Sequence, residues 1–132
     1  MSNPDIERIK VIETFHGYPL DQKYSCTVFI GKSVYIDKEK KNTVDIPEEK
    51  IDRFFKNQGY IDGYTRIPGK GRYGETLENS EMILMFDKTL RNVLKFCYEY
   101  NRKFKQEAVY LEVNPVNQFE VKGDGADATS NK

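Results

Sequence analysis

The chain has 132 residues, enough for one domain with a hydrophobic core but too few for two. Hydrophobic residues make up 38% and charged residues 32%, a mixture typical of a folded protein rather than a disordered one. The 21 basic side chains are balanced by 21 acidic ones, which argues against a generic nucleic-acid-binding protein.

Nothing in the sequence approaches the roughly 20 consecutive apolar residues that a membrane span requires, and the first residues do not read as an export signal. We therefore expect a soluble, cytoplasmic protein with no membrane partner. The single histidine, His16, and the widely separated Cys26 and Cys97 lack the spacing of a zinc site, so we expect neither a metal nor a cofactor. Both cysteines lie in apolar runs and are expected to be buried, reduced thiols.

The pattern of residues predicts an N-terminal extension over residues 1–23, a folded domain over 24–121 and a disordered tail over 122–132. Within the extension, residues 6–15 could form a further strand or a helix, because their apolar positions fit neither period cleanly. Residues 24–30 are rich in β-branched and aromatic side chains and predict a first strand. A polar connection over residues 37–42 follows.

Pro47 suits the first turn of a helix, and the acidic residues after it favour its positive end. The apolar stripe of this helix is Ile51, Phe54 and Phe55, and residues 57–59 end it. A second extended segment is expected over residues 60–67.

Residues 82–86 form a short, continuous apolar run, which predicts a strand hidden on both faces. Asp87 is the expected N-cap of the longest helix, over about residues 88–105. A last strand is expected over residues 108–113. The apolar stripe of the long helix consists of Leu90, Val93, Leu94, Cys97, Tyr100 and Phe104.

This order of elements predicts a ferredoxin-like α+β domain, βαββαβ, with an antiparallel sheet and two helices on one face. The opposite face should then be polar, yet Met82, Leu84 and Phe86 alternate with an equally apolar set, and Phe29 and Tyr110 are out of phase with their strands. We expect a cover on this second face. A second copy of the chain is the favoured cover, and the N-terminal segment is the alternative.

Between the second and third predicted strands lies a glycine-rich, cationic loop, residues 66–75. Residues 69–74 match G-x-G-x-x-G, but they follow a proline and lead into a strand instead of opening a helix, so a dinucleotide-binding site is not expected. Glycine amides and nearby cations can still bind an anion. The predicted ligand-binding residues are Arg66, Lys70, Gly71, Arg72, Tyr73 and, from the long helix, Arg102. The alternative is a solvated hairpin whose charges only confer solubility.

Three carboxylates could act as general acids or bases: Glu75, Glu81 and Glu107. No spacing distinguishes them from surface residues, so a surface position is expected for each. His16 is a further candidate base.

Two stretches resemble a family of small uncharacterised bacterial proteins with a ferredoxin-like fold, a domain of unknown function. One is residues 63–73, with Gly-x-Thr, Gly-x-Gly and an aromatic residue. The other is residues 100–109, where a tyrosine, a phenylalanine and Gln-Glu-x-Val lead from a helix into the last strand. The resemblance implies the fold and no activity.

The sequence thus favours a small, non-enzymatic protein that binds an anionic ligand, such as a nucleotide, and forms a homodimer or higher homo-oligomer. Such domains are similar to phage-encoded sponges that sequester nucleotide immune signals. One alternative is a cofactor-free enzyme of the dimeric ferredoxin-like type with Glu107, Glu75 or His16 as base. Another is a protein–protein interaction module that uses the apolar sheet face.

Overall fold

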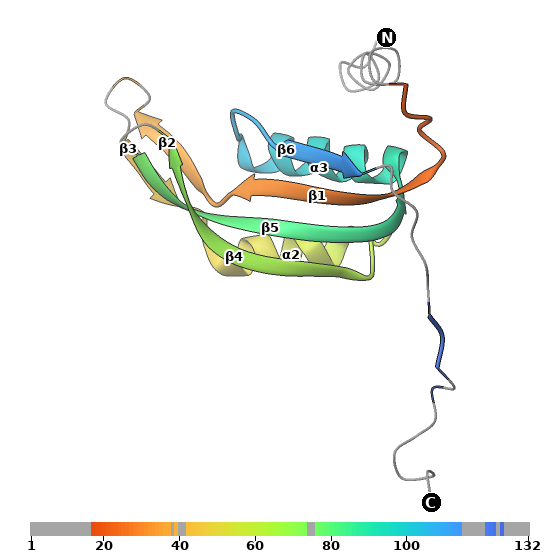
Figure 1. Ribbon diagram of the computed structural model, residues 1–132. Helices are drawn as coiled ribbons and strands as arrows, with labels where there is room; N and C mark the ends of the chain where they lie inside the picture. The colour runs from red at the N-terminus through yellow and green to blue at the C-terminus, as the bar shows by residue number, and fades with distance from the viewer. Residues whose placement is uncertain are drawn as a thin grey trace, which may run out of the picture.

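The computed structural model describes residues 17–37, 39, 42–73, 76–114, 121–123 and 125. Over these residues the chain is an α+β domain, as predicted, with the elements in Figure 1. They are β1 (Lys23–Gly31), β2 (Ser33–Asp37), β3 (Asn42–Asp45), α2 (Glu48–Asn57), β4 (Tyr64–Tyr73), β5 (Thr76–Thr89), α3 (Leu90–Phe104) and β6 (Tyr110–Asn114).

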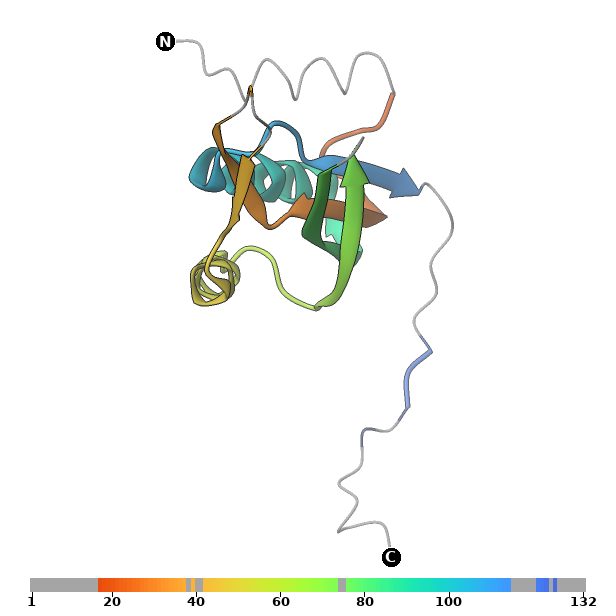
Figure 2. The same cartoon turned by 90° about the vertical axis from the view of Figure 1, so that its left-hand side faces the viewer.

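Four strands form an antiparallel sheet in the order β4-β5-β1-β6, and β2 pairs with β3 in a separate two-stranded sheet. The two helices lie on the same side of the larger sheet, behind it in Figure 1 and to its left in Figure 2. The opposite side of the sheet is turned away from both helices.

The prediction of a ferredoxin-like βαββαβ domain is wrong. The described residues contain six strands in the order β-β-β-α-β-β-α-β, because the β2–β3 hairpin precedes the first described helix. Residues 33–36 read Ser-Val-Tyr-Ile, a β-prone run that the sequence analysis left unassigned after Gly31. The hairpin lies at the same end of the molecule as the tip of the β4–β5 ribbon (Figure 1).

The core lies between the helices and the inner face of the sheet. Every predicted stripe residue of both helices is buried, together with alternate residues of β1 and β5. Phe54 of α2 contacts the rings of Phe96, Tyr100 and Phe104 of α3, at centroid distances of 5.4–5.6 Å. These tilted and edge-on contacts join the two helices into one layer.

The long helix does not begin after Asp87 as predicted. Thr89 is its N-cap, and the Thr89 hydroxyl accepts a hydrogen bond from the Asn92 amide at 3.4 Å. Asp87 instead has φ 57° within β5, beside a register shift in the β1–β5 pairing. A threonine is also a good cap, so composition alone did not decide between the two positions.

The glycine-rich segment is a strand for most of its length, which corrects the predicted loop. Gly69 and Gly71 pair with Ser80 and Glu78 of β5, and pairing continues to Tyr73. The β4–β5 ribbon is therefore ten residue pairs long, about 33 Å at the usual rise per residue. Glycines cost a strand some stability but do not prevent pairing with a long partner.

Strand β5 is hidden on one face only, which corrects the prediction of burial on both. Ile83 and Met85 are buried against the helices, whereas Met82 and Leu84 are half-buried and Phe86 is 52% exposed.

No helix among the described residues is long and apolar enough to cross a membrane.

The predicted extension, residues 1–23, is described only from residue 17. Leu20 is buried, and the carbonyls of Leu20 and Gln22 accept hydrogen bonds from the first amides of α3, those of Arg91 and Leu90. This part of the extension therefore caps a helix of the domain. Most of residues 1–23 and of the predicted tail lie outside the described residues.

Candidate functional site

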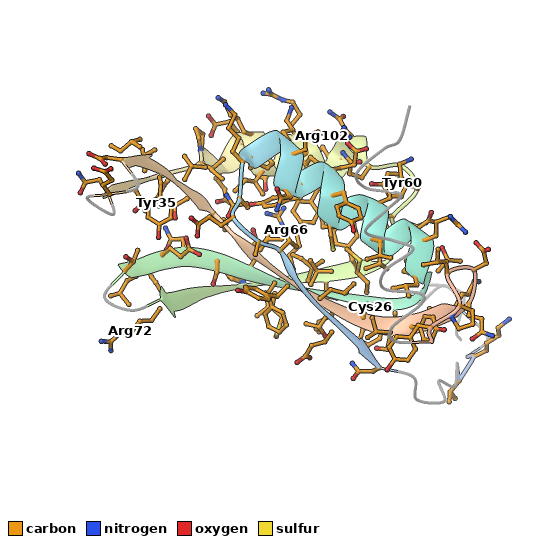
Figure 3. All side chains as sticks on the ribbon, turned by 90° about the horizontal axis from the view of Figure 1, so that it is seen from above. Cys26, Tyr35, Tyr60, Arg66, Arg72 and Arg102 are labelled. Atoms are coloured by element: carbon orange, nitrogen blue, oxygen red, sulfur yellow. The ribbon has the colours of Figure 1, made fainter. Side chains whose placement is uncertain are left out.

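The predicted ligand-binding residues whose side chains are described do not surround one recess. Figure 3 places Arg66 in the interior, Arg72 at the far end of the β4–β5 ribbon and Arg102 on the outer side of α3. Lys70 and Arg72 are exposed on β4, and Arg102 forms an exposed ion pair with Glu99 at 3.3 Å. Gly71 is part of the ladder with β5. The side chain of Tyr73 lies outside the described part of the chain.

Arg66 is engaged by carboxylates of its own chain. Its Nε and Nη2 each donate to a different oxygen of Glu81 at 2.7 Å, and its Nη1 donates to Asp52 at 2.8 Å. The guanidinium carbon lies 4.1 Å from the centroid of the Phe55 ring, so the cation also stacks on α2. These contacts explain the position of Arg66 without a ligand.

Glu81 is the centre of this network and is only 4% exposed, although a surface position was predicted for it. Burial raises the pKa of its carboxyl, but hydrogen bonds from Arg66 and Lys32 outweigh burial and hold the pKa below its ordinary value. Lys32 lies 3.2 Å from Glu81 and 2.8 Å from Glu48. Its burial opposes the charge, and the two carboxylates still raise its pKa. The network is a buried structural ion-pair cluster.

A cavity of about 130 Å³ lies at the end of the larger sheet, where the β2–β3 hairpin leaves it. Four parts of the chain meet there: the end of β1, strand β2, the start of β5, and the connection from α3 into β6. Its lining residues are Phe29, Gly31, Ser33, Val34, Tyr35, Thr76, Glu78, Lys105, Gln106, Glu107, Ala108 and Tyr110.

Gln106 fixes the connection that forms one wall. Its Nε2 donates to the carbonyls of Ser33 at 3.0 Å and of Phe104 at 3.1 Å. Lys105 adopts a left-handed conformation, φ 51°, which ends α3 and turns the chain toward β6. The wall is therefore held by hydrogen bonds from the Gln106 side chain to backbone carbonyls of β2 and α3.

Gly31 allows the wall to come close to the strand. A Cβ added there would lie 2.6 Å from Gln106 Oε1 and 2.9 Å from Glu78 Oε1, both shorter than real contacts. The Tyr100 hydroxyl donates to the Gly31 carbonyl from the helix side. A side chain at this position would displace two polar groups of the cavity.

The cavity combines aromatic rings with carboxylates. Phe29, Tyr35 and Tyr110 line it, and Tyr35 and Tyr110 are 38% and 59% exposed. Glu78 and Glu107 contribute two carboxylates, and Glu78 Oε2 accepts a hydrogen bond from the Ser33 hydroxyl at 2.9 Å.

Among the described residues that line the cavity, Lys105 is the one basic residue beside these two carboxylates, so the formal charge of the lining is negative. Among the described residues, no group of three or more histidine, cysteine or carboxylate side chains could hold a metal ion.

Sequence reasoning identified Glu107 as a candidate base but missed Glu78, Tyr35 and Tyr110 as its neighbours. They lie on separate elements, and the unassigned β2 strand provides one wall. Gln106 and Glu107 did stand out as the Gln-Glu pair of the resembling segment, which was the one available signal. His16 and Glu75, the other candidate bases, lie outside the described residues.

Comparison with protein-family models, curated proteins and solved structures finds no match to this chain. The resemblance of residues 63–73 and 100–109 to the uncharacterised bacterial family therefore stays a hypothesis. The candidate site depends on its geometry alone.

Proposed function

We propose that this protein binds a small organic cation, such as an amine attached to a single ring or a short chain, in the cavity beside the β2–β3 hairpin. The observation that carries the proposal is the meeting of Glu78, Glu107 and three aromatic rings at one hollow. Carboxylates accept hydrogen bonds from an ammonium group, and aromatic faces attract its charge.

The size of the cavity supports a small ligand. Its volume, about 130 Å³, is close to the roughly 150 Å³ of a cavity known to hold benzene, and well below that of pockets for drug-sized molecules. A nucleotide would have to lie largely outside it.

The sign of the charge supports a cation over the anion expected from the sequence. Of the predicted anion-binding residues whose side chains are described, none lines the cavity, and Arg66 is already paired with carboxylates. An anionic ligand on the exposed cations of β4 stays a prediction, and the same experiment tests it.

A thermal-shift series with matched probes tests the proposal. Benzylamine should raise the melting temperature, because a ligand at 100 times its dissociation constant adds about 2.7 kcal/mol of stability. Benzoate, which has the same ring and the opposite charge, should give no shift. AMP is the nucleotide probe, and a shift with AMP that Arg72→Ala abolishes would support the anionic site instead.

Single amide substitutions locate the site. Glu78→Gln and Glu107→Gln should each weaken the benzylamine response, because a charge-assisted contact contributes about 1.5–3 kcal/mol. Glu49→Gln is the matched control, since Glu49 is exposed on α2, on the other side of the sheet, and does not line the cavity. An equal response in all three variants would contradict the proposed site.

A second candidate, a cofactor-free enzyme, is supported by one observation. Glu107, one of the three predicted bases, lines the cavity together with a second carboxylate. A general base must reach its substrate within hydrogen-bond distance, and a cavity residue can do so. This candidate predicts a small-molecule conversion that Glu107→Gln abolishes while Glu49→Gln leaves it intact.

A further inference from the structure

The sheet face that turns away from the helices carries apolar side chains from all four strands. We call it the open face and define it by Phe29, Ile67, Met82, Leu84 and Tyr110. The register places these residues together: Phe29 pairs with Met82 and Tyr110, and Ile67 pairs with Met82. Within the described part of the chain, the buried residues of β1 and β5 alternate with those of the open face and therefore lie on the opposite face.

This face is more apolar than a solvent-facing sheet should be. An antiparallel sheet with one wet side alternates apolar and polar residues, whereas β5 places Met82 and Leu84 on the side away from its buried residues Ile83 and Met85. Ile67 is 38% and Tyr110 59% exposed. Contiguous apolar surface of this kind marks an interaction site.

The area of the open face fits a protein partner. The four strands contain between 5 and 14 residues, so at about 3.3 Å per residue and 4.8 Å between strands the whole face has a projected area of about 600 Å² per copy, before the relief of the side chains is added. Two such faces together reach the roughly 1,000 Å² that a specific interface needs. A small ligand could not cover this area.

We propose that the partner is a second copy of this chain, packed face to face through the open face, and that it closes the mouth of the cavity. Two twisted sheets pack face to face when their inner surfaces are apolar and similarly twisted, and an identical copy meets both conditions. Twofold contacts of one surface with itself are the commonest form of homo-oligomer.

The open face and the cavity are continuous. Phe29 and Tyr110 belong to both, so a copy that covers the open face also removes the exposed edge of the cavity from water. Exclusion of water strengthens a contact between an ammonium group and a carboxylate. This part of the inference rests on the proposed function, and dimerisation itself does not.

Sedimentation velocity of the full chain over a range of concentrations is the test. The wild type should be a dimer, and Ile67→Lys should weaken the dimer by about 100-fold or more, because the twofold interface buries the added charge twice. Leu77→Lys is the matched control on the same ribbon. Leu77 is 68% exposed and pairs with Arg72, which places it on the opposite face.

Far-UV circular dichroism of each variant shows whether it is folded, and Tyr110→Lys provides a second variant on an exposed position of β6. A wild type that is monomeric at every concentration would overturn the inference, and so would a folded Ile67→Lys variant as dimeric as Leu77→Lys. A monomer would assign the cover to another segment, with residues 1–16 as the first candidate.

The benzylamine response separates this inference from the proposed function. If the protein is a dimer but benzylamine does not raise its melting temperature, the proposed function is contradicted and the proposed interface is not. If the protein is a monomer and benzylamine does raise its melting temperature, the interface is contradicted and the function is not. If both hold, benzylamine should tighten the dimer, and Ile67→Lys should weaken the benzylamine response by the same factor.

Discussion

Replacement of Glu81 by glutamine tests whether the buried ion-pair cluster holds α2 against the sheet. The Glu81 side chain is 3% exposed and is contacted by Arg66, whose side chain is 23% exposed, and by Lys32, whose side chain is 11% exposed. Breaking one partner of a buried pair costs about 3–5 kcal/mol, because the remaining charge stays away from water.

The lower end of that range applies here. Arg66 and Lys32 keep Asp52 and Glu48 as partners, and both of these carboxylates are about half exposed. We therefore expect Glu81→Gln to lower the free energy of unfolding by about 3 kcal/mol, which corresponds to a fall of about 10 °C in Tm for a domain of this size.

Urea unfolding followed by far-UV circular dichroism measures the change, since the chain has no tryptophan. The matched control is Glu99→Gln, which makes the same substitution in the exposed pair with Arg102 and should change stability by less than about 0.5 kcal/mol. The double variant Glu81→Gln, Arg66→Met should lose less free energy of unfolding than the two single variants lose in total, because the two side chains contact each other. Equal effects of Glu81→Gln and Glu99→Gln would refute the reasoning.

Three further outcomes are expected. The pKa of Glu81 is lowered in the folded protein, so its contribution to stability is present above the ordinary value of 4.5 and is lost as the pH falls through the folded pKa. Acid unfolding of Glu81→Gln should therefore depend less on pH than that of the wild type. Burial raises the pKa of Cys26 to about 11 and of Cys97 to about 12, so neither thiol should react with Ellman's reagent until urea unfolds the protein; rapid reaction in buffer would contradict their burial. Gly31→Ala should lower the free energy of unfolding by about 1–2 kcal/mol, because the added methyl group displaces the Gln106 and Glu78 side chains and disturbs their hydrogen bonds, and it should weaken the benzylamine response. An unchanged response would place the ligand elsewhere.

The spacing of apolar residues along each helix was sufficient to predict which helix residues are buried in the core. The stripe of α3 follows helical spacing, and every residue predicted for it is buried, because a helix on a sheet must turn one continuous apolar side inward. The same reasoning located α2, whose predicted stripe is buried as well.

The spacing of apolar residues within one element could not predict contacts between residues that are distant along the chain. The segment with Gly69 and Gly71 reads as a loop from composition, but the long β5 strand supplies hydrogen-bond partners that extend β4 to Tyr73. Glu81 reads as a surface residue because a lone glutamate usually is one, and only the fold brings Arg66 and Lys32 to it.

The sequence by itself determined an α+β domain, the inward sides of both helices and an excess of apolar residues on β5. These features depend on periodicity within one element, which neighbouring residues specify. Only the tertiary structure decided the order of the six strands in the described residues, the burial of Glu81 and the meeting of Glu78 with Glu107. Each of these depends on contacts between elements that are distant along the chain, and no local period records such contacts.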